Sequence, residues 1–212
     1  INNGNGWTYD SSLTFPAAFG KKSGTGGYRS FDDVGTRLAD VNGDGLIDVL
    51  RGSKDGSGTH VQMDETKVYI NKVNGWDSTS WSLPEHFTSI GNSTGVNIVD
   101  VNGDKLPDLI RANDNGSSDT YNYYLNTGNG WASQSYNLPF FLTKNATFQN
   151  SGVALVDFNG DTLVDGWNMS YTDLLGTHAT GGSVIINNAP IPDQLASVLL
   201  PNGGAINVTL DG

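Results

Sequence analysis

Three short acidic segments contain the residues whose types and spacing favour metal chemistry. The first is DVNGDGLID, residues 40–48, with three aspartates, an asparagine and two glycines in nine positions. Calcium takes about six to eight oxygen ligands, and alternate positions of a tight loop can direct oxygens towards one point. The segment therefore predicts either a calcium site or, more simply, a turn rich in Asp, Asn and Gly that holds no ion.

The same candidate ligands recur in all three segments. Positions 1, 3, 5 and 9 supply side-chain oxygens, and position 7 supplies a backbone carbonyl. The predicted metal ligands are Asp40, Asn42, Asp44, Leu46 and Asp48; Asp100, Asn102, Asp104, Leu106 and Asp108; and Asp157, Asn159, Asp161, Leu163 and Asp165. Three copies favour Ca²⁺, up to one per loop, over an ion-free turn. Mg²⁺ usually keeps several waters, and Zn²⁺ prefers Cys and His ligands, which the segments lack.

Position 6 distinguishes the three segments from one another. It is Gly45 in the first, Lys105 in the second and Thr162 in the third. Because Lys105 places a positive charge beside its site, the first segment is predicted to bind calcium most tightly. Position 4 is glycine in every copy, which lets the backbone take positive φ at low cost.

The acidic segments belong to a longer repeat. The stretches GTRLADVNGDGLIDVLRG, GVNIVDVNGDKLPDLIRA and GVALVDFNGDTLVDGWNM place their first aspartates 60 and 57 residues apart. A second element, VYINKVNGW ending at Trp76 and YYLNTGNGW ending at Trp131, recurs between them. INNGNGW at 1–7 is interpreted as the tail of an earlier copy, and VIINNAP at 184–190 as a copy without Gly-Trp.

Each repeat contains apolar runs of strand length. One run precedes the acidic segment, one follows it, and VYIN or YYLN forms a third that is rich in β-branched and aromatic residues. A fourth strand is predicted within 76–87 and 131–141. Four strands in a unit of this length are typical of a propeller blade, so the predicted fold is all-β. The best helix candidate is IPDQLASVLL at 191–200.

Composition narrows the classes of function. Twenty-two acidic residues against eleven basic ones disfavour nucleic acid, which needs Lys and Arg clusters. The absence of cysteine excludes disulfides and thiolate metal sites, and no apolar run reaches the roughly 18 residues of a membrane span. The chain begins at Ile1 and is interpreted as a piece of a longer protein.

The loops differ from those of EF-hands and dockerins. An EF-hand loop needs a bidentate glutamate at position 12 and flanking helices. Position 12 is Arg51, Arg111 or Asn168 in these loops, and their flanks have the pattern of strands.

The segments LADVNGDGLID, IVDVNGDKLPD and LVDFNGDTLVD resemble the FG-GAP/VCBS repeats of integrin α-like β-propellers. The resemblance covers about residues 1–190 and implies a loop that joins neighbouring strands of a blade and holds calcium. The surrounding pattern is similar to the propeller ahead of the shell in RHS-type secreted proteins and Tc-toxin B components, and 191–212 resembles the exit segment that enters the shell. Gly166-Trp167 departs from the pattern, so the third blade is expected to be distorted or terminal, and further blades are expected upstream.

No motif indicates catalysis, and the chain is predicted not to be an enzyme. His60 and His178 sit in equivalent GTH segments, which favours a structural role. Trp7, Trp76 and Trp131 follow Asn-Gly at equivalent positions, where repeated packing is favoured over sugar stacking. The only glutamates are Glu65 and Glu85, so a glycosidase pair would need aspartates from the loops.

The predicted function is a calcium-stabilised propeller scaffold or interaction module of a large secreted or cell-surface RHS/Tc-toxin-like protein, extracellular and bacterial. Its partners would be the rest of that polypeptide, and beyond it a protein or glycan ligand. Nucleic acid and a membrane span are not expected. The alternatives are a calcium-dependent lectin or adhesin and an accessory domain of a polysaccharide-degrading enzyme.

Overall fold

The described part of the chain is built from β-strands alone. A computed structural model describes residues 4, 6, 7, 11, 14–23, 30–54, 64–78, 81–89, 92–116, 118–144, 149–168, 183–189, 197–199 and 205–207. Within these residues every regular element is a strand, which confirms the all-β prediction. None of them forms a helix with the length and apolarity that a membrane crossing requires.

The first sheet is an antiparallel meander around a long central strand. Its strands are β3 (Thr36–Ala39), β4 (Asp48–Lys54), β5 (Glu65–Asn71) and β6 (Trp76–Asp77), followed by the short β7 (Thr88–Ser89) and β8 (Asn92–Ser93). β4 pairs with β3 on one side and β5 on the other, and β5 pairs with β6. β7 runs parallel to the end of β4 and starts the crossing to the next sheet.

The second sheet repeats this arrangement strand for strand. It consists of β9 (Asn97–Val99), β10 (Asp108–Asp114), β11 (Thr120–Asn126), β12 (Trp131–Gln134), β13 (Thr143–Lys144) and β14 (Gln149–Asn150). The main meander, β9-β10-β11-β12, again has four antiparallel strands. The prediction of four-stranded blades is therefore confirmed for the first two repeats.

The third sheet has three described strands. They are β15 (Val153–Val156), β16 (Asp165–Asn168) and β17 (Ser183–Ile185), all antiparallel. The distortion predicted for the third blade from Gly166-Trp167 stays a prediction, because residues 169–182 and 190–196 lie outside the described part of the chain.

Two hairpins lie outside the three sheets. They are β1 (Gly20–Ser23) with β2 (Ser30–Asp33), and β18 (Ser197–Leu199) with β19 (Ala205–Asn207). The helix considered for 191–200 is wrong at 197–199, where β18 pairs with β19. Residues 191–196, His60 and His178 lie outside the described residues.

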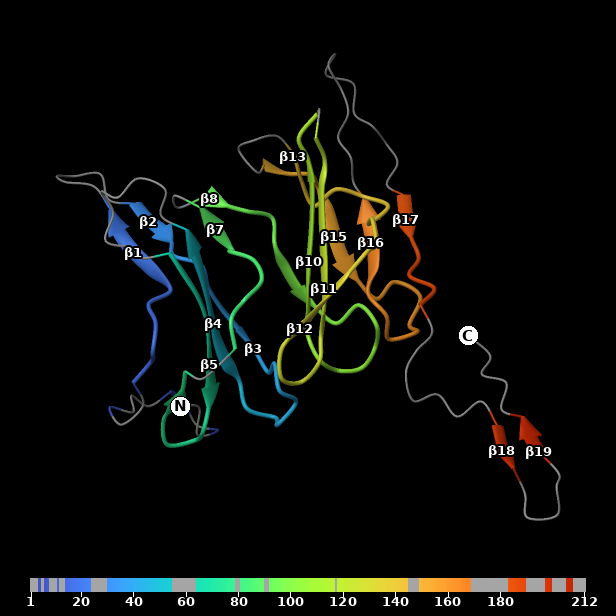
Figure 1. Ribbon diagram of the computed structural model, residues 1–212, viewed down its shortest axis with the longest axis horizontal. Coiled ribbons are helices and arrows are strands. Elements are labelled where there is room, and N and C mark those ends of the chain that lie inside the picture. Colours follow the sequence, from blue (N-terminus) through green and yellow to red (C-terminus); the bar gives the residue numbers. More distant parts are fainter. Residues whose placement is uncertain are drawn as a thin grey trace.

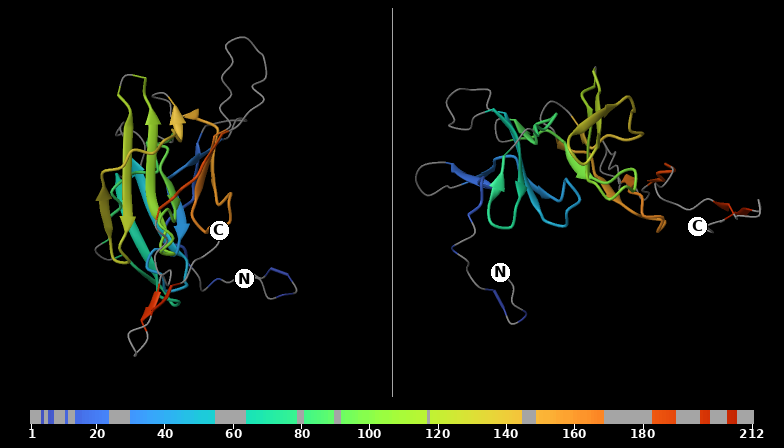
Figure 2. Two further views of the ribbon diagram at one scale, coloured as in Figure 1. Left: turned by 90° about the vertical axis from the view of Figure 1, so that its right-hand side faces the viewer. Right: turned by 60° about the horizontal axis from the view of Figure 1, so that its bottom comes forward.

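The core lies between the sheets. Figure 1 shows the three sheets side by side in chain order, and the right-hand view of Figure 2 shows them spread in the same order. Between the first two, Leu50 and Val68 pack with Leu109 of the second sheet. Ile110 and Leu142 pack with Leu155 at the next boundary. Six consecutive residues of β4 are buried. Leu50 faces the second sheet, and Arg51 donates through Nη1 to the Ala18 carbonyl at 3.3 Å.

Tryptophans join each sheet to the segment before it. The ring of Trp131 lies edge-on to Trp81, with centroids 6.3 Å apart. Trp76 contacts Phe15 at 5.6 Å, and its Nε1 donates to the Thr14 carbonyl at 2.7 Å. A packing role is thus seen for Trp76 and Trp131, whereas Trp7 is 85% exposed and does not share it.

The turn after β5 contains a strained residue. Val73 has φ 65°, and the equivalent turn of the second repeat has Gly128 at φ 76°. A β-branched residue in the left-handed region costs on the order of 1–3 kcal/mol, and Val73 is exposed, so it gains little from packing. Val73→Gly should raise the free energy of unfolding by about 1 kcal/mol in urea titrations, after the entropic cost of glycine. Gly128→Val is the reciprocal control and should lower it; a loss in both variants would contradict the argument.

Candidate cation-binding loops

Each acidic segment closes a hairpin between the first two strands of its sheet. The flanking residues are cross-strand partners in all three cases: Ala39 with Asp48, Val99 with Asp108, and Val156 with Asp165. Position 9 is therefore also the first residue of β4, β10 or β16. The prediction that the loop joins neighbouring strands of one sheet is confirmed.

The aspartate at position 1 organises the turn. Both carboxylate oxygens of Asp40 accept backbone N–H groups, from Gly43 at 2.8 Å and from Gly45 at 2.7 Å. Asp100 and Asp157 bind positions 4 and 6 of their loops in the same way. These bonds need left-handed backbone at both positions. Position 4 is always glycine, but at position 6 Lys105 and Thr162 take φ of 70° and 73°.

Positions 3 and 5 form a side-chain pair. Asn42 Nδ2 donates to Asp44 Oδ2 at 2.9 Å, and the Leu46 N–H donates to Asp44 Oδ1 at 2.9 Å. The second and third loops repeat both bonds. Asp44 is exposed, and the pKa of its carboxyl is lowered by the Leu46 N–H and then by the Asn42 amide. This pair of positions places amide and carboxylate oxygens next to each other.

The aspartate at position 9 is buried. Asp48 and Asp108 are 0% exposed and Asp165 is 1% exposed. One oxygen of each accepts the N–H of position 2, and the other accepts the N–H of an asparagine that follows the third apolar run. The bonds are Val41 to Asp48 3.0 Å, Asn71 to Asp48 2.8 Å, Val101 to Asp108 3.1 Å, Asn126 to Asp108 2.8 Å, Phe158 to Asp165 2.9 Å and Asn187 to Asp165 2.8 Å. Each carboxylate thus ties its loop to the third strand.

The carboxylates of one loop repel each other. Burial raises the pKa of Asp108 to about 6, in spite of its two N–H donors, and the negative charges of Asp104 and Asp100 add to the increase. The pKa of Asp48 is raised for the same reasons. A cation at the loop would favour the ionised form of both groups.

The donor chemistry of the loops fits calcium. All candidate ligands are oxygens, which calcium prefers. An ionised carboxylate has about four acceptor sites, and the hydrogen bonds to Asp44 occupy two of them. Among the described residues, no three Asp, Glu, His or Cys side chains already stand together as a metal site. Coordination of one ion by all three carboxylates of a loop would require their side chains to rotate from these positions.

The asparagines that sequence reasoning missed connect neighbouring repeats. Asn126 Nδ2 donates to the Val41 carbonyl of the first loop at 2.8 Å and to the Pro107 carbonyl at 3.1 Å. Asn187 Nδ2 donates to the Val101 carbonyl of the second loop at 2.7 Å. The signal was present in the sequence, because VYIN, YYLN and VIIN all end in asparagine.

Residues 40–111 match the family model of the FG-GAP-like repeat. The match contains the first two loops and the strands between them, so the predicted FG-GAP resemblance is confirmed for this part of the chain. No curated protein and no solved structure gives a significant match.

The two glutamates bind arginine and tyrosine side chains of the first two sheets. Each binds an equivalent Arg and Tyr pair, although Glu65 belongs to β5 and Glu85 to the segment before β7. The distances are Arg51 to Glu65 3.4 Å, Tyr69 to Glu65 2.9 Å, Arg111 to Glu85 3.3 Å and Tyr124 to Glu85 3.2 Å. Glu85 also accepts the Asn122 amide. Glu85 therefore links the first repeat to the second.

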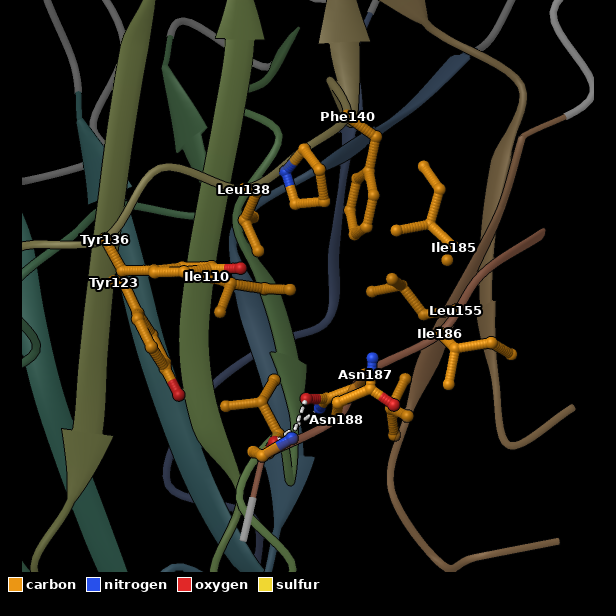
Figure 3. Close-up of a pocket in the computed structure, with 15 residues that line it drawn as sticks. Ile110, Tyr123, Tyr136, Leu138, Phe140, Leu155, Ile185, Ile186, Asn187 and Asn188 are labelled. Carbon is orange, nitrogen blue, oxygen red and sulfur yellow. Dashed lines mark hydrogen bonds between the residues drawn. The ribbon is translucent and has the colours of Figure 1, made fainter. Parts of the chain in front are cut away.

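A cavity of about 440 Å³ lies between the second and third sheets. Figure 3 shows Ile110 and Leu138 on one side of it, with Leu155 and Ile185 across from them. None of the described residues that line it has a charged side chain. Gly166 stands where the other repeats have Val49 and Leu109, and a Cβ there would overlap the ring of Phe140. Within the described lining, the two tyrosine hydroxyls of Tyr123 and Tyr136 are the groups that could take part in acid or base chemistry.

Proposed function

We propose that this chain is a non-catalytic, calcium-stabilised β-propeller scaffold and interaction module. The observation that carries the proposal is the loop architecture, which is repeated three times with oxygen donors alone. In each copy a hydrogen-bonded pair at positions 3 and 5 stands beside an aspartate at position 1 and a buried aspartate at position 9. The match of residues 40–111 to the FG-GAP-like repeat supports the propeller part of the proposal.

Calcium would act on stability and not on chemistry. Bound by the side chains of positions 1, 3, 5 and 9 and the carbonyl of position 7, it would neutralise carboxylates that now repel each other. It would also fix the loop that joins the first two strands of the sheet. In this role a cation at Asp40 and Asp44 stabilises the hairpin that positions β4.

Removal of calcium should lower the melting temperature without changing the fold at low temperature. A ligand at 100 times its Kd stabilises the folded state by about 2.7 kcal/mol, or about 5–10 °C for a domain of this size. Calorimetry with calcium, with a chelator and with magnesium would measure the effect. Asp44→Asn is a suitable control because Asp44 is exposed. It should reduce the rise in melting temperature that calcium causes, and it should change the melting temperature of the calcium-free protein less. A melt that is insensitive to chelator would refute the role of calcium.

The first loop is expected to bind calcium most tightly. Gly45 takes the left-handed backbone of position 6 without strain, whereas Lys105 and Thr162 do not, and Lys105 adds a positive charge. Calcium titration of Asp44→Asn, Asp104→Asn and Asp161→Asn by calorimetry should show that the first variant loses the tightest step. If Asp104→Asn removes that step instead, the ranking is wrong.

We further propose that the chain works outside the cell, as part of a larger secreted or surface polypeptide of the RHS or Tc-toxin type. The support is the sequence resemblance of residues 1–190 and 191–212 to such proteins. The lectin alternative has less support because contacts within the chain already hold Trp76 and Trp131. A glycan array probed with and without chelator would test that alternative directly.

A further inference from the structure

The chain is rich in the pair Asn-Gly, in which a side-chain amide reacts most readily with the backbone. Asparagine is thermolabile, and glycine lacks the side chain that would shield its own backbone nitrogen. Six such pairs lie within the described part of the chain, and they begin at Asn42, Asn74, Asn102, Asn115, Asn129 and Asn159. Because the reacting groups are the same in all six, the folded structure decides which pair reacts.

The reaction is deamidation, and it needs two groups that are free to move. The glycine N–H loses its proton, and the nitrogen attacks the side-chain carbonyl carbon of the asparagine. A C–N bond forms, the bond to the amide nitrogen breaks, and ammonia leaves with the proton. Water then opens the succinimide ring to give aspartate or isoaspartate, so no oxidant or reductant takes part. A hydrogen bond that holds the amide or the glycine N–H must open before the attack.

The pairs in the cation-binding loops are held at both groups. The Gly43 N–H donates to Asp40 Oδ1 at 2.8 Å. Asn42 Oδ1 accepts the Asp44 N–H at 3.1 Å, and Asn42 Nδ2 donates to Asp44 Oδ2 at 2.9 Å. The second and third loops repeat all three bonds. The loop structure therefore protects the asparagine at position 3 from conversion to a carboxylate.

Two further pairs are held at one group each. The Gly116 N–H, which follows Asn115, donates to Asp114 Oδ1 at 2.9 Å. Asn129 Oδ1 accepts the Thr127 hydroxyl at 2.9 Å. Each of these pairs should react more slowly than a pair without such a bond.

Asn74 and Gly75 form the pair in which neither group is held. Both residues are exposed, and within the described part of the chain the Asn74 amide and the Gly75 N–H have no hydrogen-bond partner. The Lys72 N–H donates to the Gly75 carbonyl at 2.9 Å, just as the Thr127 N–H donates to the Gly130 carbonyl at 3.0 Å. Lys72 thus stands where the second repeat has Thr127, and its side chain has no hydroxyl to hold the asparagine.

We propose that Asn74-Gly75 is a site of spontaneous deamidation, at which the folded chain converts an asparagine into aspartate and isoaspartate. The same fold protects the three asparagines of the cation-binding loops. The product adds a negative charge close to Lys72, and its isoaspartate form lengthens the backbone by a carbon atom inside the turn that joins β5 to β6. The inference does not depend on calcium, because every bond that it uses lies within the chain.

Peptide mass spectrometry of the full chain, after incubation in mildly alkaline buffer with chelator, would test the proposal. Asn74 should be converted first. A hydrogen bond of ordinary strength corresponds to a factor of about five in an opening equilibrium, so the sites held at one group should react about five-fold more slowly than Asn74. The three loop sites, with three bonds each, should react about a hundred-fold more slowly. In the urea-unfolded chain all six sites should react at similar rates, which separates the effect of the fold from that of neighbouring residues.

Substitutions in the two equivalent turns test the cause of the difference. A Cβ added at Gly75 meets no atom within 4 Å, so Gly75→Ala should keep the turn while its methyl group shields the nitrogen and slows the reaction at Asn74. Lys72→Thr supplies the hydroxyl that holds Asn129, and it should slow Asn74 about five-fold. Thr127→Val is the reciprocal control and should bring Asn129 to the rate of Asn74.

Three results would overturn the inference. They are an Asn74 that stays unmodified in the folded chain while it reacts in urea, loop asparagines that react as fast as Asn74 in a chain that is folded by near-ultraviolet circular dichroism, and an unchanged rate at Asn74 in Lys72→Thr. The calcium proposal fails separately: a chelator-insensitive melt would contradict calcium and leave the order of the deamidation rates as it is.

Discussion

Asn126→Ala should destabilise the folded chain by about 3 kcal/mol. The side chain is 4% exposed, and its amide donates to the carbonyls of Val41 and Pro107 at 2.8 and 3.1 Å. Alanine leaves both carbonyls without this donor, and each buried polar group left unsatisfied costs about 1–3 kcal/mol. The backbone N–H to Asp108 is retained, so the loss reports the side chain alone. Urea unfolding followed by tryptophan fluorescence would measure it.

Asn71→Ala is the matched control for this experiment. Asn71 occupies the equivalent position, and its backbone N–H also donates to the buried aspartate of its loop. Its side-chain bond to the Ile47 carbonyl is exposed to solvent, where a hydrogen bond contributes about 1 kcal/mol or less. A similar loss in the two variants would mean that the bond from Asn126 to the first loop adds nothing to stability.

The strands around the loops could be predicted because the same strand pattern occurs in three copies of the repeat. Apolar runs that flank Asp40 recur around Asp100, and a single strand pattern accounts for both. The four-strand meander was predicted from the length of the repeat and from the positions of Trp76 and Trp131. The failure at 197–199 occurred where no repeat supported the assignment, and a short run such as Val198-Leu199 is ambiguous between helix and strand.

The different roles of the loop aspartates could not be predicted from spacing. Positions 1, 5 and 9 are chemically identical, and all were assigned as ligands. Burial of Asp48 and Asp108 depends on asparagines 23 and 18 residues later in the chain, and on the next sheet. Local sequence does not specify such contacts. The left-handed backbone at position 6 could not be predicted either, because lysine and threonine rarely adopt positive φ.

The connection between loops follows from the same contacts. Asn126 binds the Val41 carbonyl of the first loop through its side chain and Asp108 of the second loop through its backbone. Asn187 repeats this between the second and third loops. A side chain that was overlooked in the sequence therefore joins each predicted cation loop to its neighbour, and the stability of one repeat depends on the loop before it.

The free energy of unfolding without calcium should fall as pH rises from 4 to 6, because of Asp108. Burial raises the pKa of this carboxyl from 3.8 to about 6 in the folded chain. Between these values the folded state keeps a proton that the unfolded state has lost, so stability decreases with rising pH and the loss is complete above the folded pKa. The shift corresponds to on the order of 3 kcal/mol. Urea titrations in chelator at several pH values would measure it.

Asp108→Asn should flatten this pH dependence while lowering stability at every pH, because the amide can accept only one of the two N–H groups that now bind the carboxylate. Asp44→Asn is the control: its carboxyl is exposed and its pKa is lowered, so its own titration lies below this range and the slope should remain. Asp48 also has a raised pKa and leaves a smaller slope of the same sign, so an undiminished slope in Asp108→Asn would assign the effect to another group. Calcium should reduce the slope in the wild type, since a bound cation favours the ionised carboxylate and removes the advantage of the proton.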